Sequence, residues 1–208
     1  MLSFLEKLLN GQKVEWRKLG EVCEFRRGSF PQPYGKDEWY DGENSMPFVQ
    51  VVDVSDIGFR LQDNTKQRIS KLAQPKSVFV KKGTVIVSLQ GTIGRVAIVQ
   101  YDCYVDRTLA IFNNYIDGID KKYFAYQLKH KFDFEKENAR GSTLKTITKE
   151  EFSSFQIPLP PLAVQAEIVQ ILDTLTTNAQ AYTQALQKEI ELRQKQYEYY
   201  RNQLLNFQ

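Results

Sequence analysis

The residues of this 208-residue sequence that are best suited to chemistry lie near its amino end, in the segment RRGSFPQPYGK at positions 26–36. Arginine can bind the edge of a guanine through two hydrogen bonds, and glutamine can bind an adenine in the same way. Aromatic side chains can wedge or stack against bases. The composition of this segment therefore favours contact with DNA. The alternative is an ordinary surface loop rich in proline and glycine.

Two further segments carry small and cationic residues of the kind that contacts phosphate groups. In the GTIG segment at positions 91–94, two glycines permit positive φ angles and let the backbone approach a phosphate closely. The RGSTLK segment at positions 140–145 combines a flexible turn with hydroxyl and cationic donors. Each signal is modest alone, because many hairpins contain glycine, but the three segments favour the same kind of ligand.

Motifs for catalysis and for cofactor binding are missing from the sequence. It has no GxGxxG motif after a strand-like run and no Walker A motif, so no nucleotide site is predicted. The single histidine, His130, lies among lysines, and Cys23 and Cys103 have neither CxxC spacing nor a disulfide framework. Asp53 and Asp56 could share a metal ion, but a turn or capping role is the favoured interpretation. We therefore expect a non-catalytic chain without a cofactor or a metal.

Composition and charge indicate a globular protein of the cytoplasm. Hydrophobic residues make up 42% of the chain and charged residues 25%, and the apolar runs are far shorter than the ~20 residues that span a bilayer. Unpaired cysteines are typical of a reducing compartment. The net charge is only +3, yet residues 121–149 contain eight basic and three acidic residues. That cluster fits phosphate binding, and equally a solvated helix face.

The elements that must position these residues divide at the PLPP segment, positions 158–161. Residues 1–161 mix strand-like runs with turns, which predicts an α+β domain rich in β-structure. Residues 162–208 contain neither glycine nor proline, which predicts a helix. The expected strands in the first part are 47–52, 84–88, 95–99 and 109–112, with 84–88 and 95–99 forming a hairpin. The expected helices are 121–131 and a short one that Thr148 and Glu151 would begin as a capping box.

The pattern from Leu162 onward is helical for about 45 residues, or about 65–70 Å at 1.5 Å per residue. A domain of 160 residues cannot cover a helix of this length, and its apolar residues follow a heptad stripe with steps of four and three. The favoured prediction is antiparallel pairing with another long helix, and the alternative is a single helix docked on its own domain. The predicted dimerisation residues are Ile168, Leu172, Leu175, Ala179, Tyr182, Leu186, Ile190, Tyr197 and Leu204.

Three motifs in order along the chain resemble the specificity (S) subunits of type I restriction–modification systems. VEWRKLGEVCEFRRGSF (positions 14–30) resembles the opening of the family's target-recognition domain, and GTVIVSLQGTIGRVAIV (83–99) resembles its central hairpin. GSTLKTITKEEFSSFQIPLPPLAVQAEIVQILD (141–173) resembles the end of that domain and the start of the conserved helix. One departure is Val164, where many members carry Glu before the Gln, and it affects helix-start packing only.

The resemblance implies a target-recognition domain over residues 1–161 and a long helix over 162–208 that serves as dimerisation and spacer coiled coil. It implies a non-catalytic DNA-recognition subunit that docks a DNA adenine methyltransferase, which brings S-adenosylmethionine, and through that complex a restriction endonuclease subunit. The expected base or groove contacts are Arg26, Arg27, Ser29, Gln32, Tyr34, Lys36, Gln90, Thr92 and Arg95. The expected phosphate contacts are Arg107, Arg140, Ser142 and Lys145. Arg107 has the alternative of pairing with Asp106 or stabilising a strand end.

Family members carry two recognition domains in about twice this length, so the sequence corresponds to a natural or engineered half subunit or to a truncated product. Two copies paired antiparallel would restore a two-domain arrangement with twofold symmetry and would read an interrupted palindrome in double-stranded DNA. The apolar segment of Phe4, Leu5, Leu8 and Leu9 would then cap the end of a partner helix. Two other functions stay open, a stand-alone DNA-binding regulator and a coiled-coil assembly protein that binds no DNA.

Overall fold

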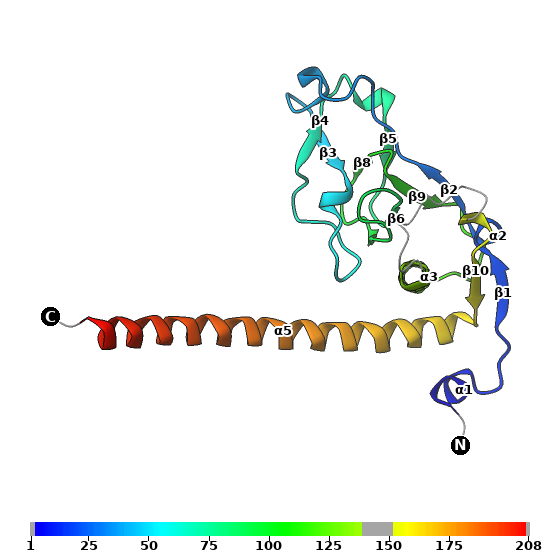
Figure 1. Cartoon of the computed structure of the whole chain (residues 1–208). Helices are drawn as coiled ribbons and strands as arrows, with labels where there is room; N and C mark the ends of the chain where they lie inside the picture. The colour runs from blue at the N-terminus through cyan, green and yellow to red at the C-terminus, as the bar shows by residue number, and fades with distance from the viewer. Residues whose placement is uncertain (1–2, 139–151, 207–208) are drawn as a thin grey trace. The chain divides into compact units, whose positions relative to one another are not determined.

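The computed structural model describes residues 3–138 and 152–206, which form two compact units, Met1–Val169 and Gln170–Gln208 (Figure 1). The predicted contacts Arg140, Ser142 and Lys145 and the capping box at Thr148 lie outside the described residues. The helices are α1 (Phe4–Leu9), α2 (Leu19–Val22), α3 (Lys121–Asn138) and α5 (Leu162–Leu205), with 3₁₀ turns η1 (Asp37–Trp39), η2 (Val51–Asp53) and η3 (Gln74–Lys76). The strands are β1 (Glu15–Lys18), β2 (Glu24–Arg27), β3 (Met46–Val49), β4 (Gln67–Ile69), β5 (Val78–Val80), β6 (Val85–Ser88), β7 (Val96–Ile98), β8 (Cys103–Val105), β9 (Leu109–Asn113) and β10 (Gln156–Leu159).

Three sheets build the first unit. One has the order β2-β9-β6-β7 and is antiparallel throughout, and a second has the order β4-β3-β8-β5, in which β3 and β8 run parallel. The third is the antiparallel pair of β1 and β10, which joins the two ends of the domain. The predicted hairpin is confirmed, because β6 and β7 pair with Val85 opposite Ile98.

The predicted strand 47–52 is wrong at its carboxyl end, where β3 stops at Val49 and η2 follows. The buried carboxylate of Asp53 accepts hydrogen bonds from the backbone N–H groups of Gln50, at 2.8 Å, and Lys66, at 2.7 Å. These bonds turn the chain out of the strand direction. Asp53 thus has the capping role that the sequence favours over metal binding, and burial raises the pKa of its carboxyl group.

The core lies on both faces of the β2-β9-β6-β7 sheet, because alternate residues of a strand point to opposite sides. On β6, Val85 and Val87 belong to a cluster that includes Phe132 of α3, whereas Ile86 belongs to a cluster that includes Val105 of β8. The central strand is therefore fully buried, which explains its unbroken run of β-branched residues.

The long helices of the described residues are α3 and α5. α3 extends to Asn138, seven residues beyond the predicted 121–131, and Asp120 begins it by accepting hydrogen bonds from the N–H groups of Lys122 and Tyr123. α5 runs without interruption for 44 residues, which confirms the predicted long helix and, with the β-rich domain before it, the predicted α+β fold class. At 1.5 Å per residue α5 measures about 66 Å.

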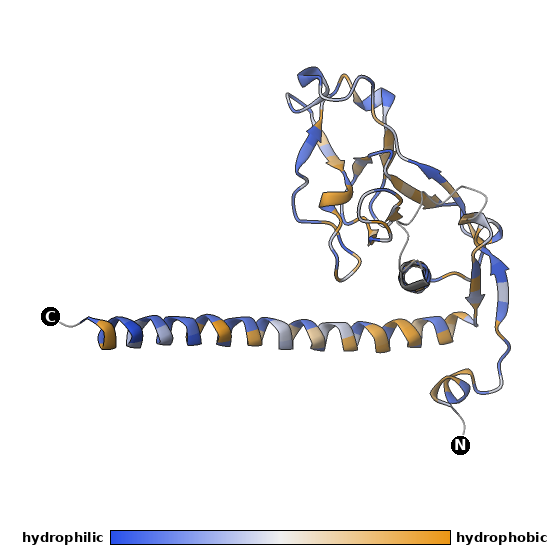
Figure 2. Cartoon of the chain, viewed as in Figure 1, coloured by the Kyte–Doolittle hydropathy of each residue, from blue (hydrophilic) through white to orange (hydrophobic). Residues whose placement is uncertain are grey.

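Most of α5 exposes apolar side chains to solvent. Apolar and polar residues alternate along it (Figure 2), and Leu175, Tyr182 and Leu186 are 60%, 73% and 63% exposed. The spacing of these residues follows the predicted heptad stripe. In the part of the chain that is described, no helix combines the length and apolar character that crossing a membrane would need.

Candidate DNA interface

Two connections of the first unit meet at one turn, residues 106–108, between β8 and β9. The loop after β2 joins it through Gly28, whose N–H donates to the carbonyl of Leu109 at 3.0 Å, and through Ser29, whose N–H donates to Val105 at 3.0 Å. The connection between β6 and β7 joins it through the N–H of Leu89, which donates to the carbonyl of Thr108 at 2.8 Å. Segments that are far apart in sequence are therefore joined at this turn.

The loop after β2 approaches this turn closely because it begins with glycine. A Cβ atom at Gly28 would lie 2.1 Å from the carbonyl oxygen of Val105 and 2.4 Å from that of Asp106. Beyond it, Phe30 is buried and packs on the rings of Tyr34, Tyr40 and Phe48, with centroid distances of 4.9, 5.2 and 4.6 Å. This aromatic cluster anchors the middle of a loop whose polar residues stay exposed, and burial raises the pKa of Tyr40.

Tyr34 and Arg107, which the sequence places in separate segments, are in contact. The Tyr34 hydroxyl donates to the carboxylate of Asp106, which is only 2% exposed. The Arg107 guanidinium lies over the Tyr34 ring at 5.0 Å from its centroid. Asp106 is occupied by Tyr34 and by Thr108, whose N–H and hydroxyl donate to it at 2.9 and 2.7 Å, so it is not the partner of Arg107 in the structure.

Two lysines flank Trp39 beside the same loop. The ammonium groups of Lys36 and Lys76 lie 5.6 and 4.7 Å from the Trp39 ring centroid, and Ser29 Oγ donates to the carbonyl of Lys76. Lys36 also forms an exposed ion pair with Glu38 at 3.2 Å. Lys76 is not among the residues predicted from sequence. It comes from η3, in a segment without a recognisable motif, and only the tertiary fold places it here.

The β6–β7 connection contributes Gln90, which is half-buried, and Thr92, which is exposed. Arg95 is turned inward instead: it forms an ion pair with Asp56 at 2.6 Å and donates to the carbonyls of Val51 and Val54 at 3.4 Å. The structure thus gives Arg95 a role in holding the 51–56 segment, and we leave it out of the interface. The predicted contacts that lie exposed or half-exposed in the described residues are Arg26, Arg27, Ser29, Gln32, Tyr34, Lys36, Gln90, Thr92 and Arg107.

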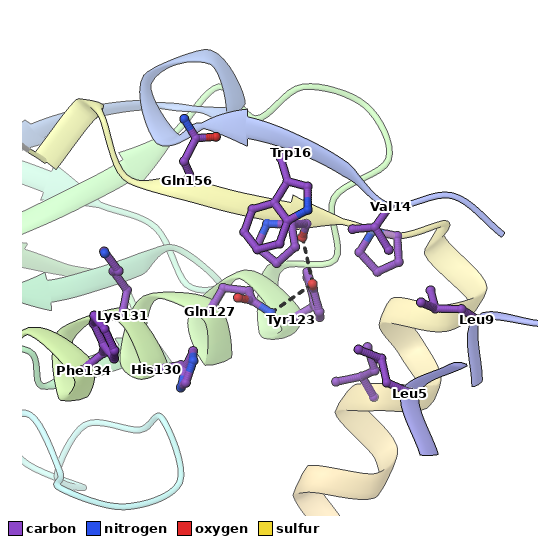
Figure 3. Close-up of a pocket in the computed structure, with 13 residues that line it drawn as sticks. Leu5, Leu9, Val14, Trp16, Tyr123, Gln127, His130, Lys131, Phe134 and Gln156 are labelled. Atoms are coloured by element: carbon purple, nitrogen blue, oxygen red, sulfur yellow. Dashed lines mark hydrogen bonds between the residues drawn. The ribbon is translucent and has the colours of Figure 1, made fainter. Parts of the chain in front are cut away.

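A separate apolar pocket of about 660 Å³ lies between α1, β1, β10 and α3 (Figure 3). Leu5 and Leu9 line one side, Trp16 and Phe134 line others and are more than half exposed, and Ile168 at the start of the α5 stripe lies at its edge. Tyr123 donates to the carbonyl of Pro158 and accepts from the amide of Gln127, and burial raises its pKa to about 12. The lining of this pocket is mostly apolar, which suits a protein segment better than DNA.

The predicted dimerisation residues lie along α5 as a stripe. Ile168 and Leu172 are partly buried, and the others are exposed: Leu175, Ala179, Tyr182, Leu186, Ile190, Tyr197 and Leu204. Among the described residues, no three His, Cys, Asp or Glu side chains gather in a way that could hold a metal ion.

Residues 12–192 of the chain match the sequence profile of the family described as the type I restriction modification DNA specificity domain. The chain belongs to this family. The resemblance seen in the three sequence motifs is thereby confirmed, and it rests on segments from both the domain and the helix.

Named relatives give the same picture. This member of the family is 31% identical over 216 residues to the specificity subunit of the type I restriction enzyme EcoprrI of Escherichia coli, covering 99% of this chain and 53% of that protein. It is 28% identical to the EcoR124I/EcoR124II specificity subunit, also from E. coli, covering 100% and 50%. The chain thus spans about half the length of the curated relatives it matches. Both are named as specificity subunits, in keeping with the prediction of a non-catalytic subunit.

Solved structures share the fold. The HsdS subunit from Thermoanaerobacter tengcongensis superimposes with a TM-score of 0.62 at 25% identity, over 87% of this chain and 44% of that one. A chain from a structural study of complex assembly and conformational transition in a type I R-M system superimposes with a TM-score of 0.68 at 24% identity, over 93% and 49%.

Proposed function

We propose that the chain recognises a specific sequence in double-stranded DNA as the specificity subunit of a type I restriction–modification system. The observation that carries this proposal is the meeting of two connections at the 106–108 turn, where exposed donors lie beside anchored aromatic rings. Cationic groups supply the sequence-independent affinity for phosphates, and arginine and amide side chains can read base edges. Family membership makes DNA the ligand of choice over other polyanions.

The chain has no catalytic role in this proposal. It docks a DNA adenine methyltransferase subunit, which binds S-adenosylmethionine, and through that complex it meets a restriction subunit. What supports this is the family and the name of a structural neighbour that concerns complex assembly of a type I system. The chain's part is to place the methyltransferase on one sequence rather than another.

The chain pairs with a second copy through α5 in an antiparallel arrangement, so that one target half is read twice in inverted orientation. The exposed stripe on α5 supports pairing, because Leu175, Tyr182 and Leu186 leave apolar surface uncovered in the single chain. Antiparallel pairing places the carboxyl end of one α5 beside the amino end of the other. The pocket lined by Leu5 and Leu9 adjoins Ile168 at that end, which supports the prediction that the amino-terminal segment caps a partner helix.

Selection from randomised duplex DNA tests the proposal. The purified full chain, alone and mixed with the methyltransferase subunit of its own system, is incubated with the duplex pool at near-physiological salt, and bound duplexes are sequenced. A short motif that recurs as an inverted copy at fixed spacing is the expected result.

An enriched single motif without an inverted copy would support DNA recognition and contradict the homodimer. Enrichment that needs no methyltransferase and a chain that does not bind one would favour the stand-alone regulator. A folded chain that enriches nothing, with or without the methyltransferase, would favour an assembly protein.

A further inference from the structure

The turn between β8 and β9 carries Arg107, the one described arginine among the proposed contacts whose guanidinium lies over an aromatic ring. Arg107 is exposed, and within the described residues it has no carboxylate partner, whereas Lys36 and Arg95 are paired with Glu38 and Asp56. Its guanidinium lies 5.0 Å from the centroid of the Tyr34 ring. Stacking restricts the plane of the guanidinium and leaves its N–H groups available for hydrogen bonds.

The Tyr34 ring that Arg107 contacts is held in place by its own partners. Tyr34 donates its hydroxyl proton to Asp106, a carboxylate that is 2% exposed and that also accepts two hydrogen bonds from Thr108. The ring also contacts that of Phe30, which is buried, at a centroid distance of 4.9 Å. Burying a carboxylate carries a desolvation cost. Here that carboxylate holds an aromatic ring and the backbone of one turn in place.

A phosphate contact does not need such an arrangement, because a phosphate accepts hydrogen bonds from many directions and any mobile lysine can serve. Reading a base does need it. Guanine offers two acceptors, N7 and O6, in the plane of the base, and a guanidinium matches both with two parallel N–H groups when its own plane is set. The β6–β7 connection that contains Gln90 is joined to the same turn, because the N–H of Leu89 donates to the carbonyl of Thr108.

We propose, resting on the proposed function as a DNA-recognition subunit, that Arg107 is a specificity-determining residue that reads one guanine in the major groove. Tyr34 is its positioning residue, and Asp106 fixes Tyr34. This replaces the phosphate contact that the sequence predicts for Arg107 with a contact to a base. Each half of the target would then contain a guanine whose recognition depends on this one side chain.

The test is a cycle of protein and DNA changes with the full chain and the duplex motif obtained by selection. Each guanine of one half-site is replaced in turn by adenine, and separately by 7-deazaguanine, which lacks the N7 acceptor. The wild-type chain is expected to lose roughly 10- to 100-fold in affinity at one guanine on either replacement. Arg107→Lys, which keeps the charge but not the planar fork, is expected to lose a similar factor on the intact motif. The affinity of the Arg107→Lys variant for the duplex should then change by no more than about twofold on either replacement at that guanine.

Tyr34 is tested through base preference rather than affinity alone. Tyr34→Leu removes the stacked ring and is expected to reduce discrimination at the same guanine and at no other position. Tyr34→Phe keeps the ring but loses the bond to Asp106, so it should retain part of the discrimination. Arg193→Lys is the matched control, because Arg193 is an exposed arginine of α5 paired with Glu189, and it should change no base preference.

The possible failures are distinguishable. If the wild-type chain enriches no motif, the proposed function fails and this inference fails with it. If a motif is obtained but Arg107→Lys weakens all duplexes by the same factor, Arg107 is a phosphate contact and the inference alone is overturned. A change of preference at a base other than guanine overturns the guanine assignment in the same way.

Discussion

Gly28 determines how closely the loop after β2 can approach the turn that carries Asp106 and Arg107. Two backbone oxygens lie within 2.4 Å of the place where a Cβ would stand, and they belong to the same backbone to which Ser29 is hydrogen-bonded. We expect Gly28→Ala to lower the free energy of unfolding by about 3 kcal/mol, at the upper end of overpacking costs. Urea denaturation of the purified chain measures it.

Gly35→Ala is the matched control for this change, because it lies in the same loop with open space around its Cβ and a φ of 85°. Only the left-handed backbone opposes an alanine there, at a cost of ~1–2 kcal/mol. If Gly28→Ala costs no more than Gly35→Ala, the loop can move away from the turn, and the close approach is not what holds it.

The two cysteines supply a second prediction at the scale of single residues. Burial raises the pKa of the Cys23 and Cys103 thiols to about 12. The folded chain should therefore resist a thiolate-specific disulfide reagent at pH 8, and both thiols should react once the chain is denatured. An unfolded thiol ionises near pH 9 while the folded thiol keeps its proton. The contribution of each buried, protonated thiol to the free energy of unfolding is therefore complete below about pH 9 and is lost as the pH rises toward 12.

This pH dependence is measured as the free energy of unfolding in urea between pH 8 and pH 11. Each buried thiol contributes a decrease of about 1.4 kcal/mol per pH unit above pH 9. Cys103→Ala should show a shallower decrease than the wild-type chain, whatever its stability at pH 8. Equal slopes in the two proteins would contradict the expected protonated thiol in the folded state.

At the scale of elements, sequence periodicity predicts a strand or a helix where a single local pattern of burial determines the residue types. The β-branched run at 84–88 and the stripe from Leu162 onward predict β6 and α5, because burial on both faces and a heptad spacing leave direct traces in residue types. The sequence favours a turn role for Asp53 but still extends the strand to residue 52, because it does not show the bond that Asp53 accepts from Lys66, thirteen residues away. For the same reason the sequence identified Tyr34 and Arg107 as separate candidates but could not show that they touch.

The side chain of Gln165, near the start of α5, forms hydrogen bonds to the backbone of the segments before α3 and α5. It is 1% exposed; its amide oxygen accepts from the N–H of Asp120 at 2.9 Å, and its amide nitrogen donates to the carbonyls of Gly118 and Pro160 at 2.9 and 2.8 Å. Gln165→Ala leaves these buried backbone groups without partners, so we expect a loss of ~2–3 kcal/mol of unfolding free energy.

Chemical denaturation measures this loss, and Gln170→Ala on the exposed face of the same helix is the control, with an expected change below about 0.5 kcal/mol. Gln165→Glu preserves the volume but turns an oxygen toward the carbonyls of Gly118 and Pro160. It should be at least as destabilising as the alanine variant at neutral pH. A Gln165→Ala variant as stable as Gln170→Ala would show that water replaces the amide.

At the scale of the whole molecule, the described residues provide a proposed DNA-binding surface and an exposed apolar stripe along α5. In the proposed dimer each copy would read one stretch of DNA, and the paired helices would set the distance between the two stretches. Pairing thus raises both affinity and target length without a second type of domain. This chain spans about half the length of the curated relatives it matches.

Leu186→Glu on α5 tests this pairing directly. Leu186 is 63% exposed in the single chain, so the substitution costs the isolated fold little and acts on association. Burying an unpaired carboxylate in a helix pair costs about 3 kcal/mol or more, which raises the dimer dissociation constant by at least two orders of magnitude. We expect wild-type chain to sediment as a dimer and Leu186→Glu as a monomer at the same concentration.

Gln184→Glu adds the same charge away from the stripe and should remain dimeric. If the wild-type chain is monomeric, or if both variants are dimers, the stripe does not pair two copies. A monomeric Leu186→Glu should still bind a single half-site but lose its preference for the inverted pair at fixed spacing.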